Sequence, residues 1–223
     1  MSIAPWSFSK IKAFEQCPKQ FYHMKVLKEF EDKETEAMRY GTLMHEAAEN
    51  YVKESTPLPS EFKYVHAGLD ALMSIQGEKL CEFKMGLTEK LDPCDFFADD
   101  VWWRGIADLI ILDEENRKAW VVDYKTGKST RYADKGQLEL MALAVFKYFP
   151  KVEQVKGGLL FVVCTELIKE QYSDKDQTLL WDKWQSKFNQ MEVAFESDVW
   201  NAKPNGLCRN HCPVIECVHN GKN

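Results

Sequence analysis

The amino-acid sequence predicts an α/β fold, in which helices flank a β-sheet. Two runs rich in β-branched and apolar residues, 105–112 and 119–126, enclose a polar, turn-forming segment at 113–118. This pattern is typical of a β-hairpin. On both sides of the hairpin, apolar residues recur at the spacing of amphipathic helices. A length of 223 residues suits one sizeable domain over residues 1–223, with a core at about 36–175.

The other elements follow from the same rules. Ser7 or Ser9 can cap a first helix, which Pro18 ends directly after Cys17. The remaining pattern predicts helices over 20–28, 39–54, 61–81, 136–149 and 176–197, a strand beginning near 82 with a loop at 92–100, and a strand pair within 156–172.

Composition and charge narrow the class of protein. The formal net charge of −6 argues against a generally basic nucleic-acid-binding surface. The N-terminal stretch MSIAPWSFSK lacks the apolar segment of a signal peptide, and no run is long and apolar enough for a membrane helix. We therefore expect a protein that acts in the cytoplasm, without a membrane partner.

The hairpin carries an unusual set of charges. If 114–117 form the loop, Asp113 pairs with Lys118 and Asp108 falls directly opposite Asp123. Asp123 and Lys125 then point to one face of their strand. Two facing carboxylates repel unless a cation lies between them, and Mg²⁺ prefers such oxygen ligands. The alternative without a functional site is a pair of solvated aspartates beside a surface lysine. The apolar strands around these residues disfavour it, because burying an unpaired charge is costly.

Seven cysteines in an intracellular chain favour metal or redox chemistry over disulfides. Three of them form the C-terminal pattern C-x₃-C-x₄-C, at Cys208, Cys212 and Cys217. A tetrathiolate site needs a fourth cysteine, and Cys17, which like Cys212 is followed by proline, is the obvious one. A Cys₃His zinc site that uses His211 or His219 is the main alternative, and a purely redox cluster is a minor one.

An aspartate on one strand and D-Y-K-T-G on its partner resemble the PD-(D/E)XK nuclease superfamily, specifically its RecB-like branch. His45, which follows G-T-L on a predicted helix, and Gln137, in the first turn of another, resemble further motifs of that branch. The branch often carries a tyrosine four residues after the glutamine, where this chain has Met141. The resemblance implies a central mixed β-sheet flanked by helices.

The resemblance also implies roles for these residues. Asp108, Asp123, the Tyr124 carbonyl and His45 would hold Mg²⁺ or Mn²⁺, Lys125 would assist the attacking water, and Gln137 would position Lys125 or its strand. Lys128, Arg131 and Lys135, basic residues beyond the hairpin, would contact DNA unless they form an ordinary solvated loop.

The cysteines resemble those of an iron–sulfur branch of the superfamily, which includes AddB nuclease domains, CRISPR-adaptation nucleases and small phage exonucleases. That branch often shows C-x₂-C-x₅-C, whereas His211 occupies the usual middle position here. The resemblance favours a [4Fe–4S] cluster on Cys17, Cys208, Cys212 and Cys217 over zinc, with the segments 6–29 and 198–223 forming a clasp.

These features together lead us to expect a metal-dependent DNA nuclease, most simply an exonuclease in DNA recombination, repair or phage DNA processing. Its partner would be single-stranded DNA or DNA with free ends, with a recombination protein as a further partner. One alternative is a non-catalytic DNA-binding or assembly subunit of the same fold. Another is a zinc-stabilised RNA-processing nuclease.

Overall fold

The chain divides into two compact units in a computed structural model that describes residues 5–30 and 34–222. The sheet unit comprises Thr35–Trp181, and the terminal unit comprises Met1–Glu34 together with Asp182–Asn223. Residues 1–4, part of the N-terminal stretch on which the expectation about export rests, lie outside the described residues. The organisation of residues 1–223 as one domain stays a prediction.

The sheet unit is built on a mixed sheet, as the sequence led us to expect. Its described strands form one six-stranded sheet in the order β2-β1-β3-β4-β5-β6. Only the β4–β5 pair is parallel, and helix α5 makes the crossover between these strands. The strands are β1 Glu78–Leu87, β2 Pro93–Cys94, β3 Trp103–Asp113, β4 Lys118–Lys125, β5 Gln154–Phe161 and β6 Glu166–Ser173.

The register of the central hairpin confirms the predicted pairing from the turn as far as Leu109 and Val122, whereas Asp108 and Asp123 do not share a face as expected. β3 and β4 are antiparallel, with Asp113 paired to Lys118 at the turn. The ladder runs as far as Leu109 and Val122, so the next two residues in the same register are Asp108 and Asp123. The two strands separate at this point, and the separation creates a fork in the sheet.

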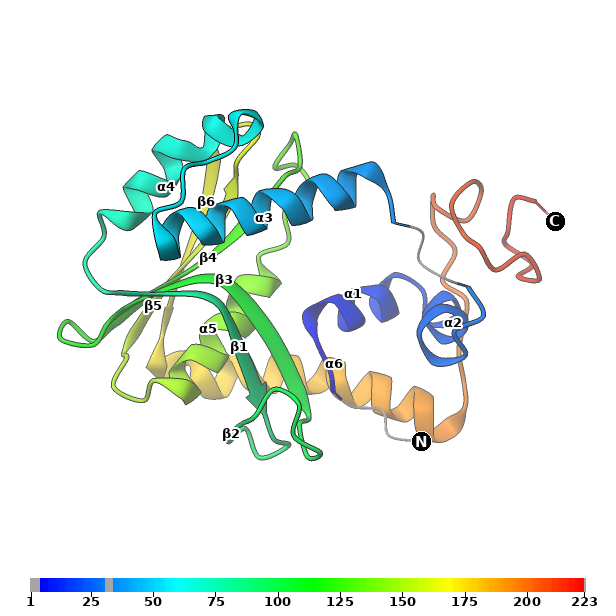
Figure 1. Cartoon of the computed structure of the whole chain (residues 1–223). Helices are drawn as coiled ribbons and strands as arrows, with labels where there is room; N and C mark the ends of the chain where they lie inside the picture. Colours follow the sequence, from blue (N-terminus) through cyan, green and yellow to red (C-terminus); the bar gives the residue numbers. More distant parts are fainter. Residues whose placement is uncertain (1–4, 31–33, 223) are drawn as a thin grey trace. The chain divides into compact units, whose positions relative to one another are not determined.

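Helices cover both faces of the sheet (Figure 1). α3 Glu36–Glu54, the 3₁₀ turn Ser60–Val65 and α4 His66–Met73 lie on one face, and α5 Gly136–Tyr148 lies on the other. The α3–α4 core includes Met44, Leu69, Leu109 and Ile111, each fully buried. Burial of each such side chain stabilises the fold by about 1.5–3 kcal/mol. This packing fixes α3 beside the hairpin.

The chain ends build the terminal unit. α1 Phe8–Gln16 starts at Ser7, whose side chain accepts from the Lys10 N–H, and ends before Cys17. α2 Pro18–Phe21 runs into the π-helix Tyr22–Val26. α6 Gln177–Ser197 begins in the sheet unit and continues in the terminal unit. Aromatic pairs such as Trp6–Phe188 and Phe14–Trp200 pack the terminal unit together.

One predicted element is wrong in part. The helix expected over 61–81 ends at Met73, and β1 already begins at Glu78. Gly77 between them adopts a φ of +130°, where an added Cβ would lie 2.6 Å from the Leu112 carbonyl oxygen. The turn at Gly77 thus brings β1 against β3, which periodicity does not reveal. Within the described residues, no helix is both long and apolar enough to cross a membrane.

Candidate active site

Asp108 occupies the fork between β3 and β4. Its Oδ2 accepts a hydrogen bond of 2.7 Å from the Tyr124 backbone N–H, in place of the missing ladder bond. The same oxygen lies 3.4 Å from Nδ1 of His45 on α3. The Asp108 carboxylate on β3 therefore contacts both β4 and helix α3.

A kink in β1 adds a residue that sequence analysis missed, Glu82. In a regular strand, Cys81 and Phe83 would point to the same face. Here Cys81 packs against the α3–α4 core, whereas Phe83 contacts Tyr148 of α5. Glu82 between them has a φ of +47°, a left-handed conformation that is rare for non-glycine residues and clusters at functional sites.

Glu82 completes a set of ligand atoms. One atom each from His45, Glu82 and Asp108 lie within 4.8 Å of one another. His45 Nε2 also lies 3.0 Å from the Tyr124 carbonyl oxygen. Neighbouring ligands of an octahedral ion with bonds of 2.0–2.1 Å stand about 3 Å apart. The donors, which are two carboxylates, an imidazole nitrogen and a carbonyl oxygen, are of the kinds that Mg²⁺ or Mn²⁺ accepts.

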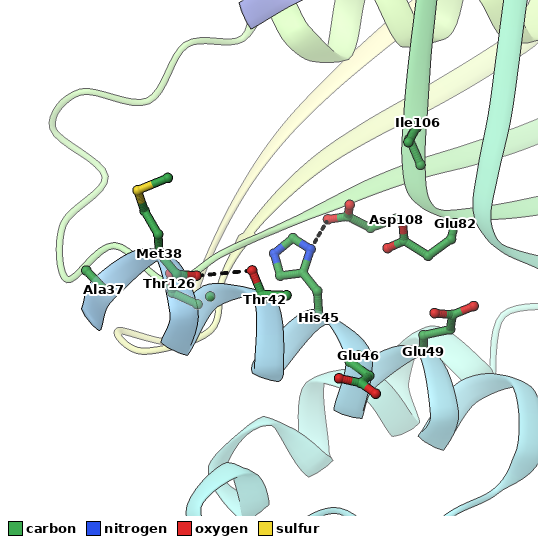
Figure 2. Close-up of a pocket in the computed structure, with 11 residues that line it drawn as sticks. Ala37, Met38, Thr42, His45, Glu46, Glu49, Glu82, Ile106, Asp108 and Thr126 are labelled. Carbon is green, nitrogen blue, oxygen red and sulfur yellow. Dashed lines mark hydrogen bonds and ion pairs between the residues drawn. The ribbon is translucent and has the colours of Figure 1, made fainter. Parts of the chain in front are cut away.

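These residues line one groove between α3 and the sheet (Figure 2). Ala37, Met38 and Thr126 lie at one end of it, and Ile106 and Glu82 lie at the other. His45 and Asp108 point toward each other between the two ends. Glu49, one turn beyond His45, also lines the groove, although Lys53 lies 3.6 Å from its carboxylate.

A second set of side chains lies on the α5 side of β4. Lys125 Nζ lies 2.6 Å from Asp123 Oδ2 and donates to Gln137 Oε1 at 2.8 Å. Gln137 Nε2 in turn donates to Asp123 Oδ1. Gln137 sits in the first turn of α5, so the start of this helix holds both charged side chains of the D-Y-K segment in place.

The electrostatics show excess negative charge at the fork. Burial and the nearby Asp108 raise the pKa of Asp123, and the charge of Lys125 only partly offsets them. Burial also raises the pKa of Glu82, with Asp108 and Glu49 adding to the effect. Burial opposes the charged form of His45, but Asp108 outweighs it and raises the His45 pKa. A bound cation would relieve this repulsion.

The structure brings together Asp108, His45 and the Tyr124 carbonyl, and separately Asp123, Lys125 and Gln137. Asp123 interacts electrostatically with Asp108 but is not among the three groups that share the 4.8 Å cluster. Glu82 could have been inferred once β1 was paired with β3, since it falls in register with Asp108. The helix predicted over 61–81 hid this pairing, because it placed the chain just before Glu82 in a different element.

The predicted DNA-contacting residues follow β4. Lys128 and Arg131 are exposed, and the Arg131 guanidinium lies 5.4 Å from the Tyr132 ring centroid. Lys135 lies 2.5 Å from Glu170, so its charge already has a partner. A DNA-binding role for the three residues stays a prediction.

The four predicted cluster cysteines all line one cavity in the terminal unit. Those residues are Cys17, Cys208, Cys212 and Cys217. His219 lines the same cavity, whereas His211 is not part of its lining. Cys81, Cys94 and Cys164 lie in the sheet unit.

A solved structure has a fold similar to that of this chain. A structure of a candidate exonuclease from Eubacterium rectale superimposes with a TM-score of 0.54 at 12% identity, covering 92% of this chain and 86% of that one. The crystal structure of SSO0001 covers 99% of this chain and 88% of its own, at 12% identity and a TM-score of 0.46. No curated protein matches the chain.

A protein-family model also matches the chain. The model of the PD-(D/E)XK nuclease superfamily matches residues 5–82 and 63–217, which include the groove, the hairpin and the cysteine pattern. The strand order, the carboxylates at the fork and this match lead to one conclusion: the chain belongs to the PD-(D/E)XK nuclease superfamily.

Proposed function

We propose that the protein is a metal-dependent DNA nuclease, and more specifically an exonuclease. The observation that carries this proposal is the convergence of His45, Glu82 and Asp108 within 4.8 Å, beside the Asp123–Lys125–Gln137 set. Asp123, which interacts with Asp108 and pairs with Lys125, thus links the ligand atoms to a charged amine.

The residues fit Mg²⁺ or Mn²⁺. His45, Asp108, Glu82 and the Tyr124 carbonyl would hold the ion, with Asp123 close enough to share its charge. When bound, such an ion polarises a phosphodiester and makes water easier to deprotonate. The pKa values of Asp123 and Glu82 are raised first by burial and then by the charge of Asp108, and the second effect is one that a bound cation would relieve.

Lys125 is the residue suited to act on the reacting atoms. The Asp123 carboxylate and the Gln137 amide oxygen hold its ammonium from two sides. A fixed ammonium can orient an attacking water and stabilise negative charge that develops on the phosphate. Gln137 touches Lys125 and Asp123, so we assign it a positioning role.

Two observations support DNA as the substrate and an exonuclease mode. The E. rectale protein of similar fold is named as a candidate exonuclease, and Lys128 and Arg131 supply exposed cations beyond the hairpin. A non-catalytic DNA-binding subunit is disfavoured, because buried like charges cost stability without serving binding. Recombination, repair or phage DNA processing would employ such an activity, with a recombination protein as partner.

A nuclease assay on end-labelled linear and on circular DNA, with Mn²⁺ and with EDTA, tests the proposal. We expect Mn²⁺-dependent degradation of linear DNA and survival of circular DNA. Asp108→Asn, Asp123→Asn and Lys125→Ala should each reduce the rate by about 100-fold or more, and Glu82→Gln by about 10-fold or more.

Lys118→Ala, at the opposite end of β4, is the matched control and should cut normally. Undiminished cutting by the Lys125→Ala or Asp108→Asn variant would refute the mechanism. Degradation of RNA but not of DNA would show that the substrate is RNA and would refute the proposed DNA substrate.

We also propose that the terminal unit holds a [4Fe–4S] cluster on Cys17, Cys208, Cys212 and Cys217. Three of these sulfurs accept backbone N–H bonds, from Lys203 to Cys17, from Asn205 to Cys208 and from Val214 to Cys212. Hydrogen bonds of this kind stabilise cluster-bound thiolates.

The spacing of the four sulfurs supports the cluster over zinc. A tetrahedral zinc ion with Zn–S bonds of about 2.3 Å places its ligands about 4 Å apart. Across residues 5–30 and 34–222, the group that brings three ligand atoms within 4.8 Å of one another is His45, Glu82 and Asp108, so no three of the four sulfurs are that close together. A larger centre matches that separation better.

A further inference from the structure

Two exposed aromatic side chains, each beside a cation, belong to segments that adjoin residues lining the groove at its two ends. The Tyr132 side chain is 85% exposed, and the Arg131 guanidinium lies 5.4 Å from its ring centroid. Phe97 is 71% exposed, with Lys84 Nζ at 5.7 Å from its ring centroid. Large aromatic groups exposed in this way often mark interaction sites.

Tyr132 belongs to the segment that leaves the catalytic strand. The segment starts at Thr126, which lines the groove beside Met38 (Figure 2). Thr130 donates to Glu166 of β6 at 2.9 Å, and Lys135 pairs with Glu170 of β6 at 2.5 Å. β6 thus anchors the segment on both sides of Tyr132, so the exposed ring is held in place.

Phe97 contacts two cations, Lys84 and Arg104, that neighbour a residue at the other end of the groove. Lys84 on β1 pairs in register with Ile106 on β3, and Ile106 lines the groove near Asp108 and Glu82. Arg104, two residues along β3 and so on the same face as Ile106, has its guanidinium 5.9 Å from the Phe97 ring. Within the part of the chain that the structure describes, neither Lys84 nor Arg104 forms an ion pair with a carboxylate.

We propose that the groove takes a single-stranded nucleic acid, with one base stacked on Tyr132 and another on Phe97. This inference rests on the proposed nuclease function and names the form of substrate that the same site prefers. Aromatic side chains stack on unpaired bases of any sequence, and Arg adds a cation–π contribution. In a duplex the base faces are already stacked on each other, so neither ring can reach them.

The charges near the two ends differ. Lys128 and Arg131 near Tyr132 suit phosphates. Asp95, Asp99 and Asp100 surround Phe97 in sequence and oppose phosphates there. Phe97 would therefore stack on a base, and the sugar-phosphate backbone of the nucleic acid would be bound mainly on the Tyr132 side. We expect Tyr132 to contribute more to affinity than Phe97.

Binding to a fluorescein-labelled oligothymidine of about 12 nucleotides, a usual length for single-strand sites, tests this in EDTA, which prevents metal-dependent cutting. The Tyr132→Ala variant should bind the probe about 5- to 150-fold more weakly, the range for loss of a base-stacking aromatic. Its affinity for a blunt duplex of equal length should change by no more than about twofold. Phe97→Ala should show a smaller loss of the same kind.

Two control variants test whether the loss of affinity is due to base stacking at Tyr132. The Tyr132→Trp variant keeps the stacking surface and should retain wild-type affinity. Leu179→Ala removes a side chain that is 73% exposed on α6 and does not line the groove, and it should bind normally. Wild-type melting temperatures are expected throughout, because the substituted side chains are exposed.

The outcomes separate this inference from the proposed function. Unchanged affinity of both alanine variants for the oligothymidine, or a wild-type preference for duplex, overturns the inference even if the protein cuts DNA. Weaker oligothymidine binding by Tyr132→Ala, restored in Tyr132→Trp, supports the inference even if no cutting is seen in Mn²⁺. In the second case only the proposed nuclease function fails.

Discussion

At the scale of single residues, Asp123 lowers the stability of the fold in order to supply a charge to the candidate active site. Only 6% of it is exposed, and burial together with Asp108 raises its pKa above the ordinary 3.8. A raised carboxyl pKa means that the folded state favours the protonated form. Its contribution to stability is therefore present below the unfolded pKa and is lost as the pH rises through the folded pKa.

This sign gives a prediction for the protein without bound metal. Asp123→Asn should raise the free energy of unfolding at pH 8 by about 1–3 kcal/mol, and the gain should shrink toward pH 4. Asparagine keeps an oxygen for the Gln137 amide to donate to, and removes the charge that Asp108 repels. Urea unfolding in EDTA at both pH values measures the effect. A variant less stable than wild type at pH 8 would show that the Lys125 ion pair outweighs the repulsion.

At the scale of elements, Glu15 joins two helices of the terminal unit. Its carboxylate lies 2.5 Å from Lys187 of α6 and 3.1 Å from Lys12 of α1. Burial disfavours the charged form of Glu15, but the two ammonium groups outweigh burial and lower the pKa below 4.5. The resulting stabilisation is present above the ordinary pKa and is lost as the pH falls through the lower folded value.

We therefore expect Glu15→Gln to lower the free energy of unfolding at pH 7 by about 0.5–1 kcal/mol, allowing for solvent screening. The difference from wild type should shrink toward pH 3, because protonation of Glu15 removes the charge that the two ammonium groups stabilise. Urea unfolding midpoints at the two pH values provide the measurement. Glu196→Gln, an exposed position on the same helix α6, is the control and should change neither midpoint. An equal loss for Glu15→Gln at both pH values would point to packing instead of charge.

At the scale of the whole molecule, the proposed cluster closes a very long loop. Cys17 lies near one chain end, and Cys208, Cys212 and Cys217 lie near the other. By analogy with a disulfide, a crosslink between them stabilises the folded chain by about 5 kcal/mol in the chain-entropy treatment. That is a large share of the roughly 5–15 kcal/mol available to a typical domain.

Anaerobically purified protein should therefore be brown, and replacement of any of the four cysteines by serine should bleach it and lower its melting temperature. Cys81→Ser, Cys94→Ser and Cys164→Ser in the sheet unit are the controls and should keep the colour. Iron, sulfide and zinc analysis completes the test. About one zinc per chain with neither iron nor sulfide would replace the cluster by a zinc site.

Local patterns in the sequence were enough to predict much of the sheet unit. The polar turn at 113–118 between two apolar strands determined the hairpin register, since a shift of one residue would move every apolar side chain to the other face. The apolar spacing of 136–149 likewise predicted α5, whose first turn brings Gln137 to Lys125. The candidate site residues on these elements could be predicted from the sequence, because the position of each follows from short-range spacing.

What only the tertiary structure decided depends on pairing between distant segments and on backbone conformation. Glu82 reaches Asp108 because β1 pairs with β3 and because its own backbone turns left-handed, a conformation that no propensity of glutamate predicts. The same pairing sets Lys84 and Arg104 beside Phe97, while β6 holds the segment that carries Tyr132. Sequence spacing reports which residues share an element. Only the packed sheet determines which elements, and therefore which charges, line the groove.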